Sequence, residues 1–153
     1  MKQSPSFIGR TRLLVVATTL SLSLYSAAAQ SQEASGSAPS LTLELNGTQP
    51  SEKGCRLTFV VANDLGADLT RAAFEIALFN DQGVVERLMV LDFRDLPEGK
   101  TKVSRFDLAG ADCAKTSRVL VNSVTECSGK GVQPDACMKG LKTSSKAAIT
   151  FGL

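Results

Sequence analysis

The sequence contains no histidine and no tryptophan, and its single tyrosine, Tyr25, lies near the N-terminus. Without histidine, the chain cannot form a Ser-His or Cys-His catalytic pair, and it offers no imidazole ligand for zinc. Stacking platforms for sugars or bases would have to come from phenylalanine, which is more often part of a core. We therefore expect a protein that is not an enzyme and that carries no cofactor and no metal.

The first 29 residues have the parts of an export signal. A basic start is followed by an uncharged run over residues 13–25 and by three alanines at 27–29. We predict a signal peptide at 1–29, cleaved after Ala29, and general secretory export that leaves a bacterial protein periplasmic or secreted. A membrane anchor is the alternative, but the uncharged run is shorter than the roughly 20 residues that span a bilayer. We expect no membrane insertion after cleavage.

The charge of the remaining chain excludes two classes of partner. Removal of residues 1–29 takes away three of the 17 basic residues and none of the 15 acidic residues, which leaves a net charge of −1. A nearly neutral chain without a run of like charges has no electrostatic footprint for nucleic acid or for an anionic membrane. Residues 30–40 are small and polar, which predicts a disordered lead-in, and residues 41–153 predict one domain with a modest core.

From residue 41 onward, the sequence consists of short alternating runs with a turn signal about every ten residues. These runs predict seven strands, the last of which should point Ile149, Phe151 and Leu153 inward. A single helical turn is expected within residues 134–141. Seven short antiparallel strands in an exported domain predict an all-β fold, an immunoglobulin-like β-sandwich, with a small barrel as the alternative. The expected strands are 41–45, 56–63, 72–79, 84–93, 101–108, 118–125 and 147–153.

The best-marked hairpin in the chain turns at residues 80–83, Asn-Asp-Gln-Gly. Residues 80–82 can close a type I turn, and Gly83 supplies the left-handed residue that a G1-bulge hairpin needs. If Asn80 pairs with Val84, one face of the hairpin is core. That core face would carry Phe74, Ile76, Leu78, Leu88 and Val90.

The opposite face of the same hairpin is also apolar in this register. It would carry Val85 and a possible partner patch of Ala77, Phe79, Met89, Leu91 and Phe93, with Glu75 and Arg87 among them. A sheet face open to water should alternate to polar residues. The second apolar face is therefore either covered by the chain or bound by a partner, and we expect partial covering by the chain.

Four cysteines, Cys55, Cys113, Cys127 and Cys137, lie in the predicted domain, and an even count in an exported protein implies two disulfides. Successive antiparallel strands alternate in direction, so Cys55 and Cys113 should lie at one end of the sandwich and the other two at the opposite end. The two ends are farther apart than the about 7 Å that a disulfide can bridge between Cα atoms. We therefore predict Cys55 with Cys113 and Cys127 with Cys137.

Two further loops offer weaker functional hypotheses. Lys130, in the loop tied by Cys127 and Cys137, could present an inhibitory side chain to a protease, because a disulfide lowers the cost of ordering a loop. Asn63, Asp64 and Asp68 carry oxygen ligands suited to calcium, but their spacing is that of ordinary turns, so we expect no metal there.

Three segments together resemble the FxLYD-type immunoglobulin-like domains of bacterial envelope and extracellular proteins. They are Val-Ala-Asn at 61–63, FEIALFNDQG at 74–83 and Leu-Pro-Glu-Gly-Lys at 96–100, within a match over about residues 57–106. The chain has Phe-Asn-Asp where that family has Tyr-Asp, and its cysteines are not part of the family pattern. It also resembles small exported bacterial proteins. The resemblance implies a non-catalytic envelope module that contacts another envelope or extracellular protein, and it implies no ligand.

Overall fold

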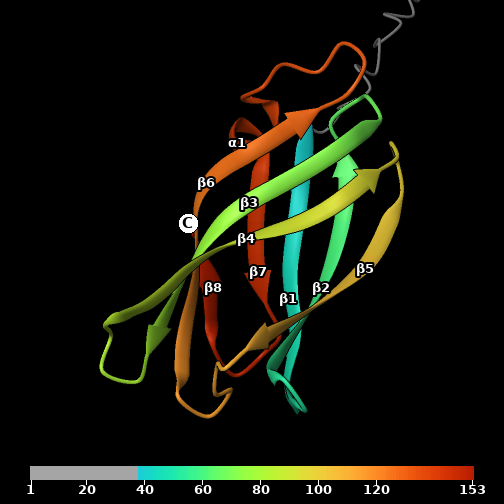
Figure 1. Ribbon diagram of the computed structural model, residues 1–153. Coiled ribbons are helices and arrows are strands. Elements are labelled where there is room, and N and C mark those ends of the chain that lie inside the picture. The colour runs from blue at the N-terminus through green and yellow to red at the C-terminus, as the bar shows by residue number, and fades with distance from the viewer. Residues whose placement is uncertain (1–37) are drawn as a thin grey trace, which may run out of the picture. The chain divides into compact units, whose positions relative to one another are not determined.

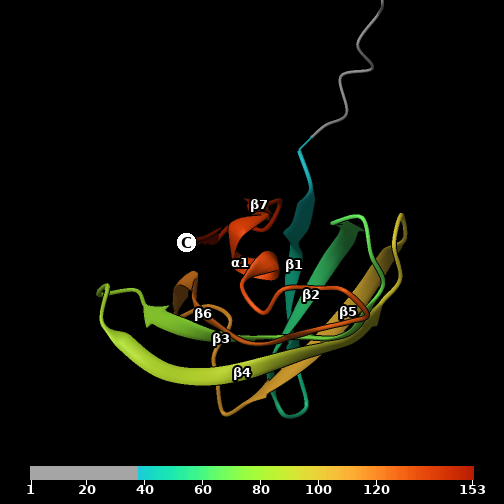
Figure 2. The same cartoon turned by 90° about the horizontal axis from the view of Figure 1, so that it is seen from above.

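The protein is described by a computed structural model for residues 38–153, and the predicted signal peptide lies outside the described residues. Eight strands form two four-stranded sheets, sheet A in the order β5-β2-β1-β7 and sheet B in the order β4-β3-β6-β8. Figures 1 and 2 show β3 and β4 running across β1 and β2 as a second layer. The elements are β1 Ser40–Ser51, β2 Gly54–Asp64, β3 Leu69–Asn80, β4 Val85–Leu96, β5 Thr101–Ala109, β6 Thr116–Ser128, α1 Ala136–Lys139, β7 Leu141–Ser145 and β8 Thr150–Gly152.

The predicted all-β sandwich is confirmed, but the structure has eight strands rather than seven. The additional strand, β7, has the sequence LKTSS, which lacks the apolar alternation that marks a strand. It pairs in parallel with β1, and β8 pairs in parallel with β6, so the two sheets are not purely antiparallel. In the predicted last strand, Phe151 is buried, but Leu153 is 57% exposed, so its predicted inward position is wrong.

The core fills the space between the sheets with the inward side chains of both. β1 contributes Leu41, Leu43 and Leu45, and its pairing with β2 continues past a register shift between Leu45 and Gly47. That shift explains why the strand runs on beyond its predicted end at residue 45, since a bulge lets pairing resume after an irregular residue. The largest fully buried side chains are Phe59 of β2 and Phe74 of β3, neither of which has exposed surface.

Both disulfides pair as the strand directions predict. Cys55 joins Cys113 across a separation of 58 residues, and Cys127 joins Cys137 across 10. Cys113 precedes β6 and Cys127 lies near its end, so each end of this strand is held by one bond. Two such bonds indicate an oxidising environment outside the cytoplasm.

A buried asparagine ties the loop after β2 to the turn after β4. Asn63 is fully buried, and five hydrogen bonds meet at its amide groups. The side chain therefore shapes two loops at one end of the sandwich, rather than offering free oxygen ligands. Its Nδ2 donates to the Ala67 and Leu96 carbonyls, its Oδ1 accepts from Leu65 N–H, its own N–H donates to Lys100 O, and its carbonyl accepts from Gly99 N–H.

Replacement of this side chain should destabilise the domain strongly. Asn63→Ala leaves one buried carbonyl, one part-buried carbonyl and one part-buried N–H without their partner, so we expect the free energy of unfolding to fall by about 3 kcal/mol. Asn122→Ala is the matched control, because Asn122 donates to Glu75 on the exposed surface and its loss should cost less than about 0.5 kcal/mol. Urea unfolding of both variants measures the difference, and equal losses would contradict the role of Asn63.

Candidate functional site

The turn of the predicted hairpin forms as expected. Asn80 N–H donates to Val84 O at 3.0 Å, and Gly83 N–H donates back to Asn80 O at 3.0 Å. Gly83 has a φ of 74°, the left-handed conformation that the turn requires of this position. The Asn80 side chain closes the turn further by accepting from the N–H groups of Gln82 and Val84.

Beyond the turn, the pairing of β3 with β4 shifts by one residue. Phe79 pairs with Val85, but Leu78 pairs with Arg87, which leaves Glu86 as an extra residue on β4. Because side chains alternate between faces, one extra residue exchanges the two faces of the strand that follows it. The predicted face assignment is therefore correct for β3 and for Val85, and wrong for the residues of β4 that follow Glu86.

The bulge changes where the predicted patch residues lie. Leu91 and Phe93 are each 2% exposed, and Met89 packs against the core. On β3, Ala77 is 3% exposed, and Phe79 is half-buried under Arg118, whose guanidinium carbon is 5.1 Å from the ring centroid. The five residues therefore do not form one exposed patch, because the opposite sheet covers those of β4.

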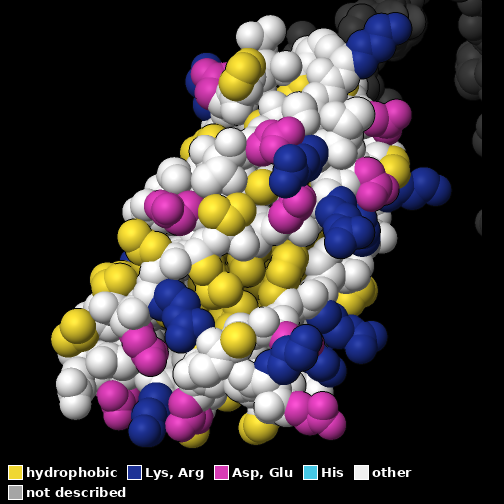
Figure 3. Space-filling model, in the orientation of Figure 1, with side chains coloured by type: hydrophobic (Ala, Val, Ile, Leu, Met, Phe, Trp, Pro, Cys, Tyr) yellow, Lys and Arg dark blue, Asp and Glu magenta, His cyan; other side chains and the backbone are white. Residues whose placement is uncertain are grey.

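Other side chains of β4 take their place on the surface. Leu88 and Val90, predicted to be core, are 55% and 53% exposed, and Val85 is 49% exposed. We call these three residues the β4 surface. They lie on an edge strand, since β4 pairs only with β3 in sheet B. Figure 3 shows hydrophobic side chains spread over this face of the molecule.

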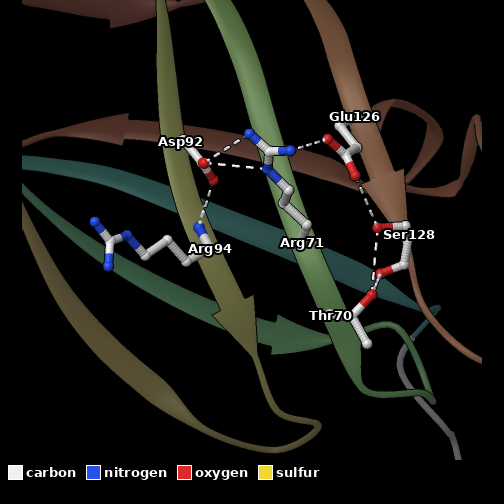
Figure 4. A network of polar contacts seen from close by, with 6 residues as sticks. All are labelled: Thr70, Arg71, Asp92, Arg94, Glu126 and Ser128. Atoms are coloured by element: carbon white, nitrogen blue, oxygen red, sulfur yellow. Dashed lines mark hydrogen bonds and ion pairs between the residues drawn. The ribbon is translucent and has the colours of Figure 1, made fainter.

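A network of charged side chains borders the β4 surface and links three strands (Figure 4). Arg71 of β3 lies between Asp92 of β4, at 3.0 Å, and Glu126 of β6, at 2.8 Å. The backbone N–H of Arg94 donates to Asp92 at 2.8 Å and, together with the Arg71 guanidinium, holds the pKa of this carboxyl below its ordinary value. Asp95 has its own cation, Lys102. Asp92 and Glu126 therefore share one cation, and Asp95 pairs with another.

A cleft lies between β4 and β5, where an edge of sheet B faces an edge of sheet A. It has a volume of about 320 Å³, and its lining includes Phe93, Arg94, Ser104, Arg105 and Phe106. The rings of Phe93 and Phe106 meet at a centroid distance of 5.1 Å, and Phe106 is only half-buried. The cleft therefore offers an apolar floor with cationic side chains beside it.

The loop between Cys127 and Cys137 presents Lys130 in a tight turn. Val132 N–H donates to Gly129 O at 3.2 Å, and Gly131 has a φ of 78°, the pattern of a type II turn with Lys130 at its second position. Lys130 is exposed. A tight turn differs from the extended backbone that pairs with the edge of a protease sheet, so nothing in this loop favours the inhibitor hypothesis, which stays a prediction.

Within residues 38–153, no group of three or more cysteine or acidic residues is arranged to hold a metal ion. Two side-chain oxygens of the candidate calcium loop are used in loop contacts, since Asn63 Oδ1 accepts from Leu65 N–H and Asp68 Oδ1 accepts from Glu98 N–H at 2.8 Å. Among these same residues, no helix has the length and apolar character needed to cross a membrane.

Comparisons of the chain with protein-family models, with curated proteins and with solved structures find no match. What the structure supports is a β-sandwich of two sheets with two disulfides. The resemblance to FxLYD-type domains stays a prediction.

Proposed function

We propose that this protein is a non-catalytic, exported β-sandwich module, periplasmic or secreted, that acts by contact with another envelope or extracellular protein. The observation that carries the proposal is the β4 surface, where Val85, Leu88 and Val90 are each about half exposed along an edge strand. Apolar groups gathered on a strand edge are typical of a site where another chain docks.

The energetics of the β4 surface favour burial by a partner. Each apolar side chain removed from water contributes about 25 cal/mol per Å² of buried area, and the free edge of β4 adds backbone donors and acceptors to a docked strand. The neighbouring ion pairs of Arg71 with Asp92 and Glu126 form a polar border to this apolar area. An apolar centre with a polar border is the usual anatomy of a protein interface.

A photoreactive amino acid in place of Leu88 tests the proposal in intact cells that produce the protein. We expect illumination to join the protein to one specific partner, because the side chain at this position would lie in the interface. Introduction of Val90→Glu into the same chain should abolish this crosslink without lowering the melting temperature, since Val90 is 53% exposed.

The matched control places the photoreactive amino acid at Leu153, which is 57% exposed and lies outside the β4 surface. We expect no specific product from this position. The same product from both positions, or a crosslink from position 88 that Val90→Glu leaves unchanged, would contradict the proposal.

A further inference from the structure

The cleft between β4 and β5 is bridged at each end by a basic side chain. At one end, Lys102 of β5 donates to the carbonyls of Phe93 and Asp95 on β4, at 3.3 and 2.8 Å. At the other end, Arg87 of β4 donates to Ala109 O at the end of β5, at 2.6 Å. Between these bridges, β4 and β5 are edge strands that pair with β3 and β2 but not with each other.

The length of the opening suits an extended chain. Residues 88–92 of β4 lie between Arg87 and Phe93 and span about 16 Å at 3.3 Å per residue. Both borders are strand edges, which carry backbone donors and acceptors for strand addition. Phe106, half-buried below the opening, can receive one apolar side chain of an inserted strand, whose side chains alternate between two faces. Figure 3 shows a hollow with a hydrophobic floor on this face of the molecule, with Lys or Arg side chains on both sides.

The charges beside the cleft select the chemistry of the inserted chain. Within residues 38–153, the guanidinium groups of Arg94 and Arg105 form no ion pair with a carboxylate. The carboxylates of Asp92 and Asp95 are already held by Arg71 and Lys102. Two cations without an acidic partner therefore remain at the rim, and they are complementary to carboxylates of a bound chain.

The backbone of Arg94 supports a role at this rim. Its φ of 60° is a left-handed conformation that disfavours a side chain at this position, and no other non-glycine residue within 38–153 has a positive φ. Figure 4 shows its side chain leaving β4 on the side opposite to Arg71 and pointing away from the charge network. Glycine would fit this backbone at lower cost, so an arginine here holds a cation at the cleft against the local preference.

We propose that the cleft between β4 and β5 binds an extended acidic segment of a partner protein as an added strand. Its apolar side chains lie on Phe106, and its carboxylates pair with Arg94 and Arg105. The inference rests on the proposed function, because it names the part of a protein partner that would enter beside the β4 surface. A small anion would reach the rim cations without contacting the floor, so the whole cleft fits a chain better.

The probe is a synthetic peptide of about seven residues in which glutamate alternates with leucine, a length within the usual range of strands. Fluorescence anisotropy of the labelled peptide with the full domain measures the Kd. We expect the peptide to bind, the version with glutamine in place of glutamate to bind about tenfold more weakly, and the version with lysine not to bind, because the rim is cationic. Absence of binding by the glutamate peptide, or equal Kd values for the glutamate and lysine peptides, would overturn the proposal.

Two substitutions locate the peptide. Arg94→Gly and Arg105→Gln should each raise the Kd about fivefold, which is the effect of one ion pair at a partly exposed site. Arg94→Gly should also melt at or above the temperature of the unaltered protein, so its weaker binding cannot be ascribed to unfolding. The control Lys142→Gln removes one positive charge from β7, at the opposite edge of sheet A. A Kd raised as much by Lys142→Gln would overturn the assignment to this cleft.

Three further outcomes separate this inference from its alternatives. If sedimentation shows that the protein is a dimer and that Arg94→Gly makes it a monomer, the cleft binds a second copy of the chain. That result would overturn the peptide proposal. A partner crosslink at position 88 without peptide binding would leave the proposed function in place and reject the cleft. Peptide binding without that crosslink would support the cleft and reject the β4 surface as the partner contact.

Discussion

Removal of the long disulfide by Cys55→Ala with Cys113→Ala should lower the free energy of unfolding by about 4 kcal/mol. The bond closes a loop of 58 residues, and the unfolded chain gains the conformational freedom of that whole loop when the bond is absent. Such a loss is a large share of the about 5–15 kcal/mol that stabilises a typical domain. Urea unfolding under oxidising conditions measures it.

The short disulfide gives the matched comparison. Cys127→Ala with Cys137→Ala opens a loop of only 10 residues, so the expected loss is about 3 kcal/mol. Both double variants replace two cysteines by two alanines, and the difference between them therefore reports loop length. A larger loss for the short bond would show that strain or packing at the cysteines, rather than chain entropy, decides their effect.

Phe59→Ala should lower the free energy of unfolding by about 4 kcal/mol, because it empties the centre of the core. Phe59 is fully buried, and its ring makes edge-to-face contacts with Phe93, Phe106 and Phe151 at centroid distances of 5.5, 6.0 and 5.3 Å. These partners belong to both sheets and to three different strands. The cavity would therefore loosen the contact between the sheets, and thermal unfolding should show the loss as a lower melting temperature.

Phe79→Ala is the control for this substitution. Phe79 is only half-buried, on the outer face of sheet B beneath Arg118. The same change there removes one cation–π contact and leaves no internal cavity, so we expect a loss of about 1 kcal/mol. Similar losses at residues 59 and 79 would contradict the central place of Phe59.

The hairpin shows what the sequence could and could not predict. The turn at residues 80–83 follows from local chemistry, since glycine at position 83 and the asparagine side chain at position 80 close it without help from distant residues. The bulge at Glu86 does not, because β4 is apolar on both faces and either register buries an apolar row. The choice between the two registers depends on how β4 packs against the other sheet, where Phe93 contacts Phe59.

The pairing of the disulfides could be predicted from the sequence, but the exposure of the β4 surface could not. Their pairing depends only on which end of the sandwich each cysteine occupies, and a shift of one residue in a strand does not alter that. Exposure of a side chain depends on the face, which the same shift reverses. Prediction of the cleft would need still more information than the face of each side chain. The cleft is formed by β4 and β5 from opposite sheets, and the distance between these strands is a property of the assembled sandwich.

The two parallel strands near the end of the described chain set the order in which the domain can be assembled. β7 completes sheet A beside β1, and β8 completes sheet B beside β6. Leu41 pairs with Leu141, a separation of 100 residues, so the edge of β1 stays open until residues 141–145 have reached it. Contacts this distant in sequence make folding slow. Until β7 pairs with β1, this edge of the folding chain is therefore open to pairing with other chains.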